Sequence, residues 1–361
     1  MTRRARRRAV SAVAAAITVA AVGVGRLHAT AGAYTVSPLV SDARTVPAPR
    51  HDRALVNAWG LAASPTGPWW TANEASGTST LYSGAGRKQL LTVQVEGGPT
   101  GIAYYGGRAL LVRGGGRSDP ARFVFACEDG KLRAWTPTVP TPWSASAEIT
   151  VDDAGLAAVF RGVAIAGDRV FATDFHGDRV VVFDGAWRQV ATGERFTDPS
   201  VPASYGPAGI QIFGGRVFVT YIGRAPVDGN DAPTGGYVDE FGLDGRLLAR
   251  VSRVGELNEP WGLALAPGSF GRYGGDLLVA SFGDGTIRAY RTVRGGWRSD
   301  GVLRTAGGKP VVVPGVWGIA FGNGGLAGPA GTLFAAAGPH RWHGASEVAV
   351  HGLLAAVAAA G

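Results

Sequence analysis

Three acidic residues, each following a short apolar run, have the types that a metal site requires. They are Glu74, Glu128 and Asp174. Three carboxylates with Asn57, Asn73 or Asn258 nearby would suit a hard cation that prefers oxygen ligands, and Ca²⁺ fits that description. His176, two residues after Asp174, is of a residue type that serves as a general base. The alternative is that Asp and Glu close to a glycine are ordinary turn residues.

A second set of residues has the chemistry of ligand binding. Trp59, Trp261 and Trp317 each stand directly before a glycine, Arg161 holds the same position before another, and Tyr221 ends an apolar run. Indole combines a large apolar area with one N–H donor, so clustered tryptophans would stack on a sugar or another flat ligand. The alternative is that these rings fill a channel and bind nothing.

The positioning element for both sets is a short pattern that occurs six times: glycine, an aliphatic residue and usually alanine. Its glycines are separated by 41, 61, 47, 53 and 56 residues, and they are Gly60, Gly101, Gly162, Gly209, Gly262 and Gly318. Such spacing is the length of four short strands with their turns. Each unit continues with compact β-branched or aromatic runs bounded by glycine, which are typical of strands. The pattern therefore predicts six repeats of four strands each.

We interpret these repeats as an all-β, six-bladed β-propeller of four-stranded antiparallel blades in a single domain, residues 34–361. Two tandem β-sandwiches would give no reason for one motif to recur six times. Glycine is expected in each innermost strand because a side chain there would collide with the neighbouring blade. Residues 34–39 are expected to close the ring by pairing with the strand near residues 348–354.

Antiparallel strands bring the candidate residues together in this fold. The first strand of each blade starts at the end of the channel where the second strand finishes. The residues before the glycines and those after the second strands therefore share one channel mouth. We expect this mouth to be aromatic on one side, from Trp59, Trp261 and Trp317, and acidic on the other, from Glu74 and Glu128 with Asp174.

The first 33 residues have the three parts of a secretory signal, so we expect a cleavable signal helix there and export of the rest. A cationic start precedes an apolar run over residues 9–24, and Ala31-Gly32-Ala33 suggests cleavage before Tyr34. The run is short for a membrane span, and no second span is predicted. Six of the 35 basic residues and none of the 27 acidic ones lie in residues 1–33, so the rest carries only +2. Nucleic acid is therefore not an expected partner. Cys127 alone rules out an intramolecular disulfide and is expected to be buried.

Several motifs carry a resemblance to known proteins, among them residues 55–62, 77–82, 172–176 and 282–287. With these motifs the chain resembles NHL-type six-bladed propellers, and more closely an uncharacterised family of secreted bacterial β-propeller proteins. The resemblance implies a fold and an extracytoplasmic location but no activity. Propeller lactonases, which the chain also resembles, hold a metal at a channel mouth, where it polarises a carbonyl and activates water.

Two functions follow from these patterns. The first is an exported binding module whose channel mouth holds a small molecule, a glycan or a protein. The alternative is a metal-dependent, lactonase-like hydrolase with Glu74, Glu128 and Asp174 as ligands. We favour the binding module because blades four to six offer no carboxylate to complete a metal cage.

Overall fold

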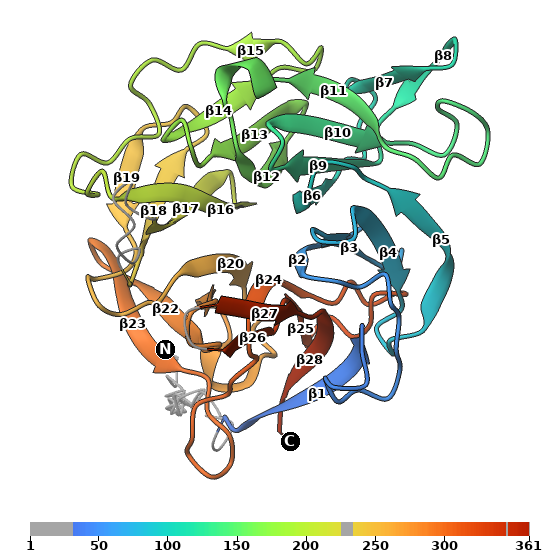
Figure 1. Ribbon diagram of the computed structural model, residues 1–361. Helices are drawn as coiled ribbons and strands as arrows, with labels where there is room; N and C mark the ends of the chain where they lie inside the picture. The colour runs from blue at the N-terminus through green and yellow to red at the C-terminus, as the bar shows by residue number, and fades with distance from the viewer. Residues whose placement is uncertain (1–31, 225–233, 344–345, 361) are drawn as a thin grey trace, which may run out of the picture.

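Six four-stranded antiparallel sheets are arranged radially around a central axis, as the computed structural model in Figure 1 shows. The structure describes residues 32–224, 234–343 and 346–360. The all-β, six-bladed propeller is confirmed, with two short 3₁₀ turns at Ala154–Leu156 and Gly271–Tyr273. The signal helix predicted for residues 1–33 lies almost entirely outside the described residues. Within the described ranges, no helix has the length and apolar character needed to cross a membrane.

The first three blades follow one another along the chain. Blade one contains β2 (Ala58–Ala63), β3 (Trp69–Asn73), β4 (Thr78–Tyr82) and β5 (Lys88–Gln94). Blade two contains β6 (Pro99–Tyr104), β9 (Phe123–Cys127), β10 (Lys131–Trp135) and β11 (Glu148–Asp152), with an inserted hairpin of β7 (Leu111–Gly114) and β8 (Arg117–Pro120). Blade three contains β12 (Phe160–Ala166), β13 (Arg169–Asp174), β14 (Arg179–Phe183) and β15 (Gln189–Val190).

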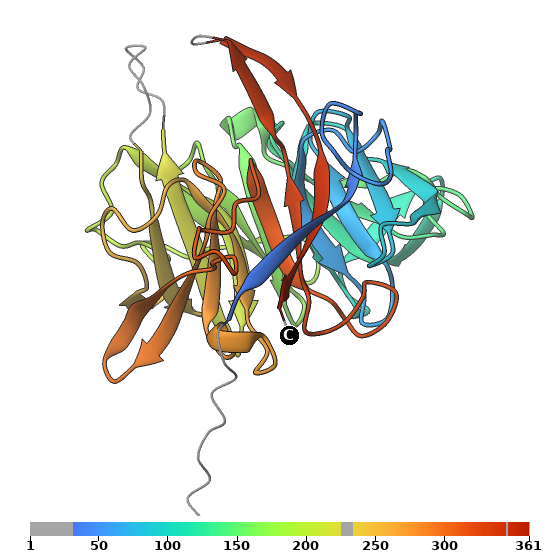
Figure 2. The ribbon, with the colours of Figure 1, turned by 90° about the horizontal axis from the view of Figure 1, so that it is seen from below.

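The remaining blades complete the ring. Blade four contains β16 (Tyr205–Phe213), β17 (Arg216–Gly223), β18 (Tyr237–Gly242) and β19 (Leu247–Arg250). Blade five contains β20 (Pro260–Leu265), β21 (Leu277–Ser281), β22 (Ile287–Val293) and β23 (Gly296–Val302). Blade six contains β24 (Val316–Phe321), β25 (Leu333–Ala337), β28 (Leu353–Ala359) and β1 (Tyr34–Ser41), with a projecting hairpin of β26 (His340–His343) and β27 (Ser346–Val350), as Figure 2 shows.

The ring closes through the amino-terminal strand, as expected, but with a different partner segment. Strand β1 pairs antiparallel with β28, from Tyr34 opposite Ala359 to Ser41 opposite Leu353. Residues 348–350, part of the predicted partner, belong instead to the hairpin strand β27. The hairpin inserted before β28 moves the last strand of the blade toward the carboxyl terminus. Tyr34 is fully buried and its hydroxyl donates to the carbonyl of Phe270, so the first residue of the latch is fixed in the core.

A glycine in each innermost strand allows the six blades to meet at the axis. A Cβ atom placed on any of these six glycines would lie 2.0–3.0 Å from the carbonyl oxygen of the residue before the next anchoring glycine. Gly318 faces Trp59 in this way, so the contact runs around the whole ring. Every first strand also has a register shift at the glycine and the residue before it, the mark of a β-bulge. The predicted packing reason for glycine is confirmed.

The apolar core lies between the blades rather than inside any one of them. One large cluster joins blades five and six, and another joins blades two and three. Cys127 is fully buried at the end of β9, as predicted, and its pKa is raised to about 12 by burial. The candidate residues therefore stand on a scaffold fixed by packing on both sides of each sheet.

Candidate functional site

The site described here is the end of the channel at which the first strands begin, and we call it the tryptophan mouth after Trp59, Trp261 and Trp317. The β-bulge in each first strand lies at the residue before the anchoring glycine, where it re-aims that side chain. Two positions before Trp59 and Trp261 stand Asn57 and Glu259, both with positive φ, at 50° and 53°. Left-handed backbone is uncommon for residues with a side chain, so these two mark an unusual entry into the strand.

The three tryptophans form one cluster, as the predicted arrangement of blades five, six and one requires. Trp59 and Trp317 stack with ring centroids 3.7 Å apart, and Phe282 covers the other face of Trp317 at 3.9 Å. Trp261 meets both tryptophans edge-on at 6.2 Å. Each tryptophan is only 5–6% exposed, so these rings contact one another and close the channel. This is the channel-filling alternative, and the ring faces of Trp317 are not open to a sugar.

Arg161 lies beside this cluster of tryptophan rings. Its guanidinium is 4.1 Å from the ring centroid of Phe175 and 5.5 Å from that of Trp59. It pairs with Glu128 at 3.5 Å, and its side chain is 20% exposed. Burial lowers the pKa of Arg161, and the carboxylates of Glu128, Glu259 and Glu74 oppose that shift. The Arg161 guanidinium is thus held among aromatic rings and three acidic side chains.

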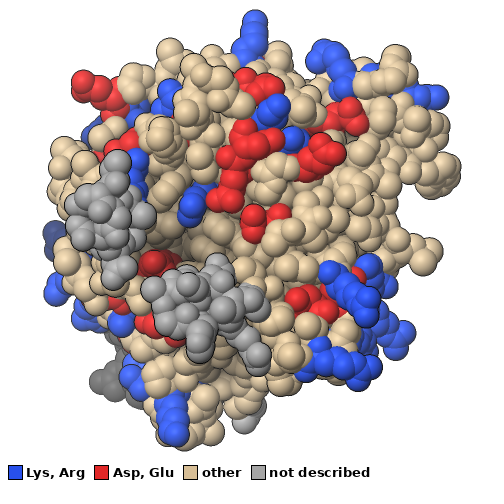
Figure 3. All heavy atoms as spheres, in the orientation of Figure 1, with Lys and Arg blue, Asp and Glu red and all other residues tan. Residues whose placement is uncertain are grey.

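The carboxylates on the acidic side are partly buried. Glu74 accepts a 2.7 Å hydrogen bond from the Asn57 side-chain amide, whose oxygen accepts from the indole of Trp317 at 3.3 Å. Burial raises the pKa of Glu128; Arg161 lowers it in part, and the nearby charge of Glu74 raises it further. Burial also raises the pKa of Glu259, and the nearby basic groups of Arg161 and His340 oppose that shift. On the face seen in Figure 3, acidic side chains gather beside the central hollow.

Asp174 and His176 do not join this cluster. Asp174 is fully buried, accepts hydrogen bonds from the backbone of Val159 and Gly177, and pairs with Arg179 at 3.0 Å. His176 is exposed in the turn that follows. In the part of the chain that the structure describes, no three His, Cys, Asp or Glu side chains are grouped to hold a metal ion. The predicted three-carboxylate site is therefore not assembled, because Asp174 is hydrogen-bonded within its own turn and paired with Arg179.

Tyr221 also differs from its predicted place. Its side chain packs between blades three and four, in a cluster with Phe171 and Tyr237, whereas the next residue, Ile222, contacts the tryptophan cluster. Side chains alternate along a strand, so a shift of one residue exchanges the channel for the space between blades. Burial raises the pKa of Tyr221 well above 10.

Glu259 was missed by the sequence reasoning. It lies three residues before its anchoring glycine, and Asn57 holds the equivalent place in blade one. The signal was present in this column of the repeat, where only blades one and five carry a polar side chain. The candidate residues were predicted instead from the column directly before the glycine, two residues closer, because it holds the tryptophans.

Comparison with known sequences places the chain in a family. It is 32% identical to uncharacterized protein R648 of Acanthamoeba polyphaga mimivirus over 300 residues, covering 80% of this chain and 73% of the relative. The chain belongs to the R648 family. Uncharacterized protein L690 of the same virus is 29% identical over 300 residues, covering 80% of this chain and 78% of L690. No family model matches the chain. These relatives are viral, so the secreted bacterial family of the sequence resemblance remains a prediction.

Two solved structures with the same architecture are enzymes, a dehydrogenase and a lyase. The soluble aldose sugar dehydrogenase of Escherichia coli has a TM-score of 0.54 at 11% identity, covering 91% of this chain and 100% of the enzyme. Virginiamycin B lyase of Staphylococcus aureus has a TM-score of 0.50 at 10% identity, covering 91% of this chain and 99% of the enzyme. At such identities the likeness shows only that this chain shares the propeller fold with these enzymes, and it carries no information on chemistry.

Proposed function

We propose that the chain is an exported binding module that captures a cationic group, on a small molecule or a protein side chain, at the tryptophan mouth. One observation carries the proposal: Glu74, Glu128 and Glu259 all act electrostatically on the single guanidinium of Arg161. The three carboxylates outnumber the basic side chains that act on them, Arg161 and His340, in a partly buried hollow. A bound cation would supply that missing charge.

The raised pKa values of Glu128 and Glu259 support a cationic ligand. They arise because burial disfavours the charged carboxylates, and the effect is only partly offset by Arg161 and, at Glu259, also by His340. An incoming guanidinium or ammonium group would stabilise the ionised forms and bind more tightly for that reason. An anionic ligand would meet like charges, and a sugar would find the faces of Trp317 already covered.

Backbone conformation at the mouth gives further support. Asn57 and Glu259 hold left-handed conformations, although glycine occupies the equivalent left-handed positions Gly98 and Gly315 of two other blades. Positive φ also occurs at five described residues outside this column, such as Trp143 and Trp187, so the conformation supports a binding role only together with the polar side chains that it places at the mouth. A chain under no demand for these side chains could place glycine there without the conformational cost.

The hydrolase alternative needs three ligands grouped closely enough to hold a metal ion. Among the described residues, Glu259 included, no three His, Cys, Asp or Glu side chains are grouped in this way. Asp174, which was predicted for that role, is held by Arg179 and two backbone amides. We therefore prefer cation capture to metal-dependent hydrolysis.

Calorimetric titration of the purified full-length chain with L-argininamide and L-citrullinamide at pH 7.5 tests the proposal. The two probes have nearly the same shape, but citrullinamide lacks the guanidinium charge. We expect argininamide to bind more tightly, and Glu128→Gln to weaken its binding about tenfold. Glu194→Gln, which removes an exposed carboxylate outside the mouth, is the matched control and should bind as the unmodified chain does.

Equal binding of the two probes, or an equal effect of both variants, would contradict cation capture. A rise in melting temperature with Ca²⁺ that Glu128→Gln abolishes would favour the metal-dependent alternative instead. Argininamide competition distinguishes the two, because a resident metal ion would exclude the organic cation.

A further inference from the structure

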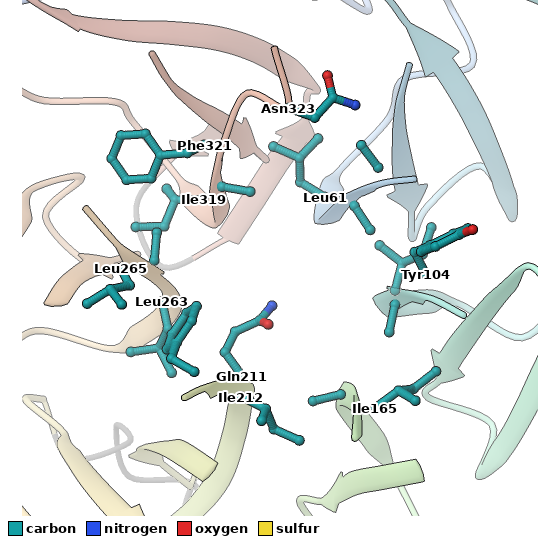
Figure 4. A pocket seen from close by; sticks show the side chains of 18 of the residues that line it. Leu61, Tyr104, Ile165, Gln211, Ile212, Leu263, Leu265, Ile319, Phe321 and Asn323 are labelled. Carbon is teal, nitrogen blue, oxygen red and sulfur yellow. The ribbon is translucent and has the colours of Figure 1, made fainter. Parts of the chain in front are cut away.

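The opposite end of the channel holds a second hollow, which we call the far mouth. It has a volume of about 480 Å³ and is lined by the last residues of the innermost strands β2, β6, β12, β16, β20 and β24. Figure 4 shows their side chains around an open centre, with Leu61, Tyr104, Leu265 and Phe321 on different sides. This volume lies in the range of small-molecule sites.

The far mouth is separate from the tryptophan mouth. Between them the channel narrows to a space of about 10 Å³, lined by the anchoring-glycine segments and Trp261. A space of that size accommodates about one water molecule at most. A ligand in one mouth therefore cannot extend into the other, and the two can be tested separately.

Among the described residues, no charged side chain lines the far mouth. Its wall consists mainly of aliphatic and aromatic residues, including Ile102, Leu263 and Ile319. The polar side chain of Asn323 is already used, because its amide donates to the carbonyls of Ser64 and Gly67. An uncharged apolar wall favours a neutral ligand, since a charged one would lose hydration without a partner.

Gln211 is the exception in both sequence and structure. The position two residues after the anchoring glycine is alanine in five blades and glutamine only in blade four. The Gln211 side chain points into the hollow in Figure 4. Its amide has no hydrogen-bond partner among the described residues. An amide offers one acceptor and two donors, so it can pair with a ligand group that both donates and accepts.

We propose that the far mouth binds a neutral, mainly apolar small molecule carrying one carboxamide group, and that Gln211 pairs with this group. The apolar wall provides the affinity through buried area, and the single amide orients the ligand. This site is independent of cation capture at the tryptophan mouth.

Equilibrium dialysis of the full-length chain with 2-naphthamide and its hydrocarbon isostere 2-isopropenylnaphthalene tests the proposal. Both probes should bind. In Gln211→Leu, the affinity for the amide relative to the hydrocarbon should fall about fivefold to tenfold, because the amide loses its partner. Leu265→Trp, at a lining residue that is 47% exposed, should weaken both probes at least tenfold by filling the hollow.

Leu248→Trp is the matched control, because Leu248 is 43% exposed on β19 and lies outside the far mouth. It should leave both affinities unchanged, and melting temperatures should show that all three variants are folded. Failure of both probes to bind, equal binding in Leu265→Trp, or an unchanged affinity ratio in Gln211→Leu would each overturn the proposal. Argininamide binding at the other mouth should be the same in every one of these variants.

Discussion

The two mouths of the channel are formed by opposite ends of the same six strands, yet their chemistry is opposed. The tryptophan mouth gathers stacked rings, one guanidinium and three carboxylates. The far mouth, as far as the structure describes its lining, has an uncharged wall with one amide, that of Gln211, that makes no hydrogen bond. The anchoring glycines lie between them, and their backbone contacts are nearly the same in every blade.

This difference shows which part of the repeat is scaffold and which part can specialise. The glycine is fixed because the next blade occupies the space of its side chain. The residue before it varies among Trp, Thr, Arg and Ala, and the residue two places after it varies only in blade four. Chemistry therefore changes at the ends of the strands without disturbing the ring.

Removing a ring at each mouth should give the largest difference between them. Trp317→Ala is expected to lower the free energy of unfolding by about 3–5 kcal/mol, because a buried ring stacked on both faces is lost. Phe321→Ala, on the same strand but only half-buried, should cost about 1–2 kcal/mol. Denaturant unfolding followed by circular dichroism measures both. Equal costs would show that the tryptophan cluster does not stabilise the ring.

Substitution of an anchoring glycine, at the boundary between the two mouths, should lower stability nearly as much. Gly209→Ala would place a methyl group 2.0 Å from the carbonyl oxygen of Trp261, so we expect a loss of about 2–3 kcal/mol. Gly268→Ala is the control, since its Cβ would meet no atom within 4 Å and its φ is not positive. That variant should leave the denaturation midpoint almost unchanged. Similar midpoints for the two variants would argue against tight contact between blades.

The pH dependence of stability should distinguish the carboxylates of the tryptophan mouth from exposed carboxylates elsewhere on the surface. The pKa of Glu128 is higher in the folded than in the unfolded chain, so the folded form binds more protons between those two pKa values. Stability contributed by this group therefore falls as pH rises from about 4.5 through the folded pKa. Glu128→Gln should raise the melting temperature at pH 8 by about 1–3 °C and have little effect at pH 4.

Thermal scans at both pH values check this, with Glu194→Gln as the control for loss of one exposed charge. Arg161 and Glu74 are the charged groups that act on Glu128, so the Glu128 effect should persist in moderate salt because they are partly buried with it. An equal gain at pH 4 and pH 8 would show that the carboxylate is not destabilised by burial.

The fold could be predicted from the sequence because the same physical demand recurs six times. Each anchoring glycine is followed by strands whose glycine-bounded turns are visible in the composition, and the tryptophans of blades five, six and one meet as that order requires. The sequence predicted that the amino-terminal strand closes the ring, but it did not predict the correct partner residues. The reason is that β26 and β27 were not recognised as an insertion before β28.

The site could be predicted only in part, because the direction of each side chain depends on strand alternation, side-chain length and local backbone conformation, which the repeat pattern does not specify. Tyr221 and Ile222 are neighbours on one strand, but only Ile222 reaches the tryptophan cluster. Asp174 resembles Glu74 in position, yet its shorter side chain hydrogen-bonds the backbone of its own turn. The position of the Glu259 side chain depends on a left-handed backbone conformation, which a sequence pattern does not predict for glutamate.

The smallest expected effect concerns Glu259, where stability and binding should change in opposite directions. Glu259→Gly removes a side chain from a residue with a φ of 53°, so the free energy of unfolding should rise by about 0.5 kcal/mol. Argininamide should meanwhile bind more weakly, because one carboxylate of the mouth is gone. Glu256→Gly, in the same loop with an ordinary φ, removes the same charge and should lower stability, since Glu256 accepts from the backbone of Arg253. If both variants lose stability equally, the left-handed conformation of Glu259 carries no cost, and its support for a binding role disappears.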